Sequence, residues 1–228
     1  MSTHPGTAAG GSGAATPIAA PTLQGPTKTP LLTFAPGLHL LSVPALLSLI
    51  SAGSGSGDEP YLASLAPRSI LLISPERPPA RLARWAAERR VHLVHFGLGP
   101  CPPLDGDAEG SHEDRDGGDR ERVCKEGVEW CVDRTRAPLI VCDTSGANEA
   151  ALVIGCLRRL QRRNFASICA EYRTIAGKRA RAANERFIEM FDTDLVSLPP
   201  RERLADWFAL HLDDDDRELA ALSEAPAG

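Results

Sequence analysis

The chain has 228 residues, 43% of them hydrophobic, and its 25 Lys and Arg against 30 Asp and Glu give a formal net charge of −5 at pH 7. The acidic excess lies in residues 105–122, so the rest of the chain is neutral overall, which argues against general nucleic-acid binding because that function requires a basic face. A basic patch within the neutral remainder stays open. The most apolar stretch, residues 38–50, is shorter than the roughly 20 residues that span a bilayer, and Pro44 interrupts it. We therefore expect a cytoplasmic protein with no nucleic-acid partner and no membrane partner.

Residues 1–29 are mostly Gly, Ala, Pro, Ser and Thr and contain almost nothing to bury. Such a segment cannot offset the entropy cost of ordering, so we predict a disordered tail. A folded domain is expected over residues 30–198. Residues 199–228 are predicted to form a last helix, which contains Trp207 and Phe208, and then an acidic tail.

Three short apolar runs have the character of buried strands: Ser69–Ser74, His92–Phe96 and Pro138–Cys142. Helical periodicity fills the intervals between them, at 80–90 and 121–132. Strands that alternate with helices predict an α/β domain whose central sheet is mostly parallel. The Gly- and Asp-rich segment 105–122, after the second strand, is predicted to be a mobile acidic loop.

A polar turn follows the third strand, and a long apolar helix is predicted over 149–163. The turn consists of Asp143, Thr144, Ser145, Gly146, Ala147 and Asn148. Backbone N–H groups there, with the positive end of the helix dipole, can bind an anion and can lower the pKa of a thiol. Cys142 is therefore a candidate nucleophile, and a buried structural cysteine is the competing interpretation. Two further helices are predicted, one capped by Asn164 and one over 182–191.

Several separated segments resemble the plant-and-fungal atypical dual-specificity phosphatases, a family that includes the fungal oxidant-induced cell-cycle arrest proteins. These segments are Arg68–Glu76, Gly155–Gln161, Phe165–Ile168, Glu171–Arg173, Lys178–Arg181 and Asn184–Asp192. They occur in the order of the family pattern, most densely between Pro138 and Asp192. The resemblance implies a protein tyrosine/dual-specificity phosphatase-like domain with a central, mostly parallel sheet flanked by helices.

The catalytic loop departs from the family pattern, in which His-Cys is followed by five residues, an Arg and then Ser or Thr. Aligned back from Gly155, Glu149 occupies the position of the phosphate-binding Arg, and Ala150 that of the hydroxyl residue. On this alignment Cys142 retains the nucleophile position, Val141 replaces the His, and the loop is one residue longer.

Such a loop is expected to bind phosphate poorly. A carboxylate about 4 Å from a phosphate charge costs ~1 kcal/mol in water and ~4 kcal/mol at an effective dielectric constant of about 20. The lost guanidinium removes about 1.5–3 kcal/mol more. Asp143 and Glu149 would also raise the pKa of the Cys142 thiol by like-charge repulsion. We hypothesise a pseudophosphatase that acts as a scaffold or regulatory subunit, and the resemblance implies related phosphatase-like partners and a role in stress or growth signalling.

Two alternatives remain open. One is an active Cys-dependent phosphatase on phosphotyrosine or inositol pyrophosphates, with Cys142 as nucleophile. The other is a sensor that binds an inositol phosphate without cleaving it. An anion-binding rim would be formed by Lys178, Arg179 and Arg181.

The remaining candidate residues favour structural interpretations. Asp105 and Asp107 lie where a general acid would be sought, but a solvated acidic loop is the simpler interpretation. Cys124 and Cys131 are seven residues apart on one helix face and are expected to pack in the core. The cysteines and histidines show no zinc-ligand spacing, and no GxGxxG or Walker motif occurs. We therefore expect no metal and no cofactor.

Overall fold

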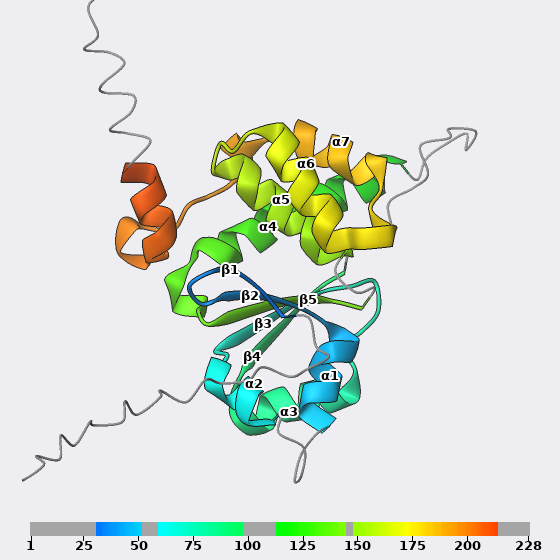
Figure 1. Ribbon diagram of the computed structural model, residues 1–228, viewed down its shortest axis with the longest axis vertical. Helices are drawn as coiled ribbons and strands as arrows, with labels where there is room; N and C mark the ends of the chain where they lie inside the picture. Colours follow the sequence, from blue (N-terminus) through cyan, green and yellow to red (C-terminus); the bar gives the residue numbers. More distant parts are fainter. Residues whose placement is uncertain (1–30, 52–58, 98–112, 145–147, 214–228) are drawn as a thin grey trace, which may run out of the picture.

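The middle layer of the domain is a five-stranded sheet, which Figure 1 shows between two groups of helices. The computed structural model describes residues 31–51, 59–97, 113–144 and 148–213. The strands are β1 (Leu32–Ala35), β2 (Leu38–Ser42), β3 (Ser69–Ile73), β4 (His92–Phe96) and β5 (Leu139–Asp143). Their order is β1-β2-β5-β3-β4, with β2, β5, β3 and β4 parallel and β1 antiparallel to β2. The predicted α/β class with a mostly parallel sheet is confirmed.

Helices cover both faces of this sheet (Figure 1). One face carries α1 (Val43–Ser51), α2 (Glu59–Leu65) and α3 (Ala80–Arg89). The other carries α4 (Glu113–Val132), α5 (Asn148–Leu160), α6 (Phe165–Ala176) and α7 (Ala182–Met190). Across the described ranges, none of the helices combines the length and the apolar character needed to cross a membrane.

Two apolar clusters fill the space between the layers, because successive side chains of a strand point to opposite faces of the sheet. In β5, Leu139 and Val141 belong to the cluster under α4–α7. Ile140 and Cys142 belong to the cluster that includes Leu82 of α3 and faces α1–α3. The alternation along β5 therefore decides which side chains can reach the loop that leads into α5.

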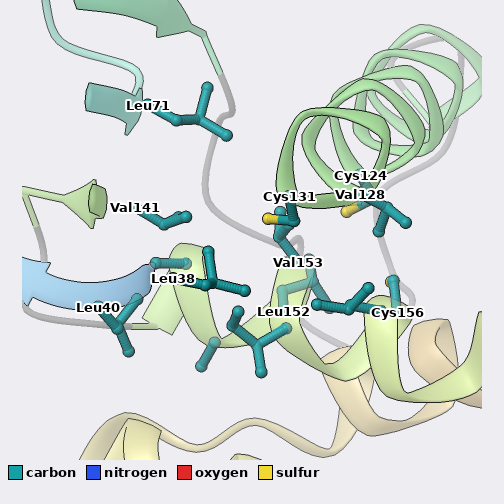
Figure 2. Close-up of a cluster of buried hydrophobic side chains, with 14 of the residues drawn as sticks. Leu38, Leu40, Leu71, Cys124, Val128, Cys131, Val141, Leu152, Val153 and Cys156 are labelled. Atoms are coloured by element: carbon teal, nitrogen blue, oxygen red, sulfur yellow. The ribbon is translucent and has the colours of Figure 1, made fainter. Parts of the chain in front are cut away.

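Three of the cysteines are core residues between α4 and α5. Cys124, Cys131 and Cys156 are buried free thiols, and Figure 2 shows them among valines and leucines of the first cluster. Burial raises the pKa of Cys131 to about 12, so its thiol is protonated at neutral pH. The predicted core packing of Cys124 and Cys131 is confirmed.

Helix α4 begins eight residues before the helix that the periodicity predicts. Because it starts at Glu113, residues 113–122 are helical, and the prediction of a loop is wrong for them. Residues 105–112 lie outside the described residues. The buried α4 residues of the core cluster, Val123, Cys124, Val128, Cys131 and Val132, all lie in its second half.

The β1–β2 hairpin is absent from the predicted elements. The apolar stretch 38–50 divides into strand β2 and helix α1, which periodicity alone does not separate. Gly37 makes the hairpin turn with φ +75°, a conformation that side chains other than glycine rarely adopt. The disordered tail predicted for residues 1–29 lies outside the described residues.

The segment after residue 198 packs into the same core as the rest of the domain. Leu204 and Phe208 are buried in the α4–α7 cluster, and residues 206–213 are helical. The carboxylate of Asp133, at the end of α4, accepts hydrogen bonds from the backbone N–H and hydroxyl of Thr135 (2.9 and 2.7 Å) and from the Arg203 guanidinium. Asp133 therefore anchors the C-terminal segment to α4.

Acid is expected to weaken this anchor. Burial raises the pKa of Asp133, but the Thr135 and Arg203 hydrogen bonds outweigh it and hold the pKa below its ordinary value of 3.8. A carboxylate whose pKa is lower in the folded state stabilises the fold above its unfolded pKa, and this stabilisation is lost as the pH falls through the folded pKa. In urea titrations from about pH 7 to about pH 3, the wild type should lose unfolding free energy more steeply than Asp133→Asn. Asp206→Asn, at a 92% exposed side chain, is the control and should follow the wild type.

Candidate functional site

The candidate site lies where the central strand β5 leads into α5. Strand β5 pairs with β2 on one side and β3 on the other, so its carboxyl end lies at the middle of the sheet. Ligand sites of open α/β sheets lie at the carboxyl ends of such strands, next to helix N-termini. Residues 145–147, which include Ser145, Gly146 and Ala147 of the predicted phosphate loop, lie outside the described residues.

Cys142 faces away from this site. Its side chain is fully buried in the cluster that faces α1–α3, on the opposite side of the sheet from α5. Burial, with a smaller contribution from the neighbouring Asp143 charge, raises the pKa of the Cys142 thiol far above its ordinary value. A buried, protonated thiol on the face of the sheet opposite α5 is poorly placed to attack a ligand at the α5 N-terminus. This placement favours the competing interpretation of Cys142 as a buried structural cysteine.

Asp143 is the residue that faces α5. Its Oδ2 accepts a hydrogen bond from the backbone N–H of Ala150 at 3.0 Å, and its side chain is fully buried. Ala150 lies in the first turn of α5, where N–H groups have no partner within the helix. A carboxylate there also interacts favourably with the helix dipole. The chain therefore places its own carboxylate on the anion-binding end of this helix.

Glu149 adds a second buried carboxylate in the same turn. Glu149 is 8% exposed, and its Oε1 accepts a hydrogen bond from the Asn148 side-chain amide at 3.2 Å. Asn148, predicted to belong to the loop, is the first residue of α5. The site therefore brings two acidic side chains, Asp143 and Glu149, to the start of this helix.

A buried polar network holds the start of α5 against α6 and α7. The Asn148 Oδ1 accepts hydrogen bonds from the Tyr172 hydroxyl (3.0 Å) and from the Asn184 amide (3.3 Å). Arg120 of α4 donates to the Asn184 Oδ1 at 3.1 Å. All four side chains are buried. Tyr172 and Asn184 lie in segments that resemble the family pattern, but that resemblance did not indicate that they meet, because the members of the network come from four separate helices.

The predicted basic rim lies next to this network. Lys178 and Arg179 belong to the short helix η2 (Gly177–Arg179) between α6 and α7, and the backbone N–H of Arg181 donates to the Tyr172 hydroxyl at 3.1 Å. Lys178, Arg179 and Arg181 are exposed. Tyr172 therefore links the basic segment to the start of α5, in an arrangement that could bring a cation toward a ligand at that end.

Polar groups from the neighbouring strands complete this edge of the sheet. The hydroxyls of Ser74 and Thr144 lie 2.8 Å apart, and the His95 Nε2 lies 2.8 Å from the Ser74 carbonyl oxygen. Ser74 and His95 were not predicted as site residues, although each lies at the end of a predicted strand. Asp105 and Asp107 lie outside the described residues. Among the described residues no group of three or more His, Cys, Asp or Glu is arranged to hold a metal ion.

Removing the Asp143 carboxylate should loosen the start of α5. Asp143→Ala leaves the Ala150 N–H without its buried acceptor, and we expect the free energy of unfolding to fall by about 1–2 kcal/mol. Asp143→Asn keeps a carbonyl oxygen there and should lose less than half as much. Urea denaturation of the three proteins measures the difference, and equal stability of wild type and Asp143→Ala would show that the carboxylate does not cap α5.

Comparison with known proteins identifies similar chains. The model of the Tyrosine phosphatase family matches residues 50–208. The putative tyrosine-protein phosphatase OCA1 of Eremothecium gossypii is 31% identical over 196 residues, which cover 82% of this chain and 82% of that protein. The inositol diphosphatase DSP2 of Oryza sativa subsp. japonica is 30% identical over 133 residues, covering 58% of this chain and 60% of that protein. The core catalytic domain of the PP-IP phosphatase SIW14 from S. cerevisiae shares the fold, with a TM-score of 0.54 at 21% identity over 72% of this chain and 86% of that one.

Proposed function

This chain belongs to the tyrosine phosphatase family, and from that premise we propose that it is a catalytically impaired member that acts as a scaffold or regulatory subunit. Its relatives include inositol diphosphatases as well as tyrosine-protein phosphatases, so the atypical tyrosine/dual-specificity group is its context. The observation that carries the proposal is the orientation of Asp143 at the start of α5.

The geometry supports a revised alignment of the catalytic loop. Because Asp143 faces α5 and Cys142 does not, we assign Asp143 to the nucleophile position of the family pattern and Cys142 to the preceding His position. Five residues then separate Asp143 from Glu149, which is the family spacing between Cys and Arg. The loop is not one residue longer, and both of its key positions carry a carboxylate.

Two carboxylates make this site unsuited to phosphate hydrolysis. Asp143 already occupies a helix N–H that a phosphate oxygen would need. Repulsion between one carboxylate and a phosphate about 4 Å away costs ~1 to ~4 kcal/mol, depending on the local dielectric constant. The missing guanidinium removes about 1.5–3 kcal/mol of transition-state stabilisation. Since each 1.4 kcal/mol or so is a factor of ten in rate, the combined loss reaches several powers of ten.

A phosphate or inositol-phosphate sensor is the second candidate function. The exposed Lys178, Arg179 and Arg181, joined to the start of α5 through Tyr172, favour it. Anion binding at this rim would not require the buried Asp143 and Glu149 positions. An active enzyme, as the names of the inositol diphosphatase and PP-IP phosphatase relatives suggest, is the third outcome that the experiment must address.

Purified protein would be assayed on an aryl phosphate and on an inositol pyrophosphate. We expect no turnover by wild type or by Cys142→Ser. The triple substitution Asp143→Cys, Glu149→Arg and Ala150→Ser should give turnover at least about 100-fold above the uncatalysed background, because it restores the nucleophile, the guanidinium and the hydroxyl. The matched control combines Asp143→Ser with the same Glu149→Arg and Ala150→Ser substitutions and should be inactive. Turnover by wild type would contradict the proposal.

Two further measurements separate a scaffold from a sensor. A thermal-shift titration with inositol hexakisphosphate should leave the wild-type midpoint unchanged if the chain is only a scaffold, whereas a shift abolished by Lys178→Glu/Arg179→Glu supports the sensor. Affinity purification of the tagged chain from its own cells should recover phosphatase-like partners. Recovery of no such partner would contradict the scaffold role.

A further inference from the structure

Helix α3 and its flanks carry arginines without an ion-pair partner among the residues that the structure describes. Arg81 and Arg84 lie on α3, Arg77 precedes the helix and Arg90 follows it, and all four side chains are exposed. None of the four makes a side-chain hydrogen bond or ion pair within the described residues. Arg81 and Arg84, three residues apart, share one side of the helix, and we call these two the α3 arginine face.

The placement of these arginines opposes the local stability of α3. Arg81 lies in the first turn, where the positive end of the helix dipole disfavours a cation. No acidic residue is present in that turn, and the N-cap Pro79 provides no side-chain hydrogen bond. Arg81 and Arg84 are also like charges at i, i+3, which repel each other. Glu88, four residues after Arg84, is the one acidic residue of α3, and no ion pair joins it to either arginine within the described residues. A charge pattern that breaks local rules with so little compensation is typical of a functional surface.

Many arginines on the other side of the sheet are neutralised. Arg122 lies 3.4 Å from both Asp119 and Glu126, and Arg158 pairs with Glu171. On the α1–α3 side, residues 31–97 contain six arginines and no lysine, against three glutamates and one aspartate. The chain therefore leaves a net positive charge on the side that contains α3.

We propose that the α3 arginine face docks the run Asp214–Asp216 of a second copy of this chain. Those three consecutive carboxylates are complementary in charge to the arginines, whereas the preceding Asp213 already pairs with Arg201. Within one copy the run follows a helix whose Phe208 is buried on the α4–α7 side, whereas α3 packs on the opposite side of the sheet (Figure 1). The run of one copy therefore meets the α3 arginine face of another, and the exchange is reciprocal in a two-fold dimer.

Such a contact is weak at each ion pair but is reinforced by its symmetry. Exposed ion pairs contribute little individually and are screened by salt. In a reciprocal dimer the second docking event takes place within the complex, at a high effective concentration. The association is therefore expected to be salt-sensitive and to depend on both the α3 arginine face and the aspartate run. It does not depend on whether the loop before α5 is catalytic.

Sedimentation velocity of the full chain tests the contact. At about 200 µM protein we expect a dimer at about 50 mM NaCl, with an apparent dissociation constant at least tenfold higher at about 500 mM. Arg81→Glu/Arg84→Glu and Asp214→Lys/Asp215→Lys/Asp216→Lys should each be monomeric alone. Mixed in equal amounts they should form a heterodimer, because the reversed α3 face then meets the reversed tail. Arg162→Glu/Arg163→Glu, an exposed arginine pair just after α5, is the control and should dimerise like wild type.

Thermal melts followed by circular dichroism show whether a monomeric variant is still folded. The charge-reversed α3 variant should melt no lower than wild type, since an acid in the first turn suits the helix dipole. A monomeric wild type at low salt, or an Arg81→Glu/Arg84→Glu variant that still dimerises alone, would overturn the proposal. Wild type that remains monomeric but sediments with phosphatidylserine vesicles through Arg81 and Arg84 would also overturn it and assign the face to a lipid surface.

Discussion

Glu171→Ala is expected to lower the free energy of unfolding by about 3 kcal/mol, because it leaves the guanidinium of Arg158 buried without its charge partner. The Arg158 Nε and Nη2 donate to the two oxygens of Glu171, each at 2.9 Å, and Nη1 donates to the Gln161 Oε1 at 2.8 Å. The Arg158 side chain is only 8% exposed and lies over the ring of Phe34, 5.7 Å from its centroid. Arg158 is therefore a structural residue that joins α5, α6 and β1.

An exposed pair between the same kinds of residue is the control for this effect. Arg173 pairs with Glu185, but the Arg173 side chain is 62% exposed, so Arg173→Ala should cost less than about 1 kcal/mol. Glu171→Leu combined with Arg158→Met should recover much of the loss, because an apolar pair removes the uncompensated charge. Urea denaturation at neutral pH measures wild type and these variants. A cost for Glu171→Ala no larger than that for Arg173→Ala would show that the buried pair contributes no special stability.

Gly155→Ala is expected to destabilise the fold by about 1–3 kcal/mol, although alanine is the better helix former. A Cβ at position 155 would lie 2.4 Å from the Cδ1 of Ile188 and 2.9 Å from its Cγ1. Ile188 is fully buried, so moving its side chain away from a new Cβ would disturb its other core contacts. Gly155 thus permits the close approach of α7 to α5, and the same approach brings Asn184 to Asn148.

A double-substitution cycle identifies the contact that causes this loss. Ile188→Val removes the Cδ1 atom, so Gly155→Ala combined with Ile188→Val should be more stable than the sum of the two single effects predicts, by at least about 0.5 kcal/mol. Gly127→Ala in α4 is the control, since a Cβ there would lie 3.0 Å from the Val153 Cγ1 and should cost less. Thermal and urea unfolding both report the effect. Strict additivity would mean that the Ile188 contact is not the cause.

The regular elements could be predicted where one physical signal dominates. The strand at His92–Phe96 is an apolar run of strand length, and Asn164 accepts the Ala166 N–H as an N-cap, as its side-chain chemistry predicts. The start of α4 could not be predicted, because residues 113–122, which include Gly117 and Gly118, have the composition of a loop. Strand β2 of the hairpin was not predicted, because the apolar stretch 38–50 contains both this strand and helix α1.

The site was predicted in its position along the chain but not in its chemistry. The turn after β5 and the acid at Glu149 could be read directly from the residues. Whether Cys142 or Asp143 faces α5 depends on the register of β5 between β2 and β3, and a shift of one residue exchanges the two faces of a strand. Backward alignment from Gly155 placed Cys142 at the nucleophile position, whereas the hydrogen bond from Ala150 to Asp143 is the observation on which our proposed alignment rests.

The sequence alone determined the α/β class, the family and the acidic character of the loop, because periodicity, motif order and residue charge are local properties. The tertiary structure alone decided that Cys142 is a core residue and that Asp143 caps α5. It also decided that Arg158 is paired, whereas Arg81 and Arg84 of α3 have no ion pair within the described ranges. Each of these depends on which side chains from distant segments meet on one face of the sheet. A single residue pattern does not contain that information, since burial and pairing arise only when the layers pack.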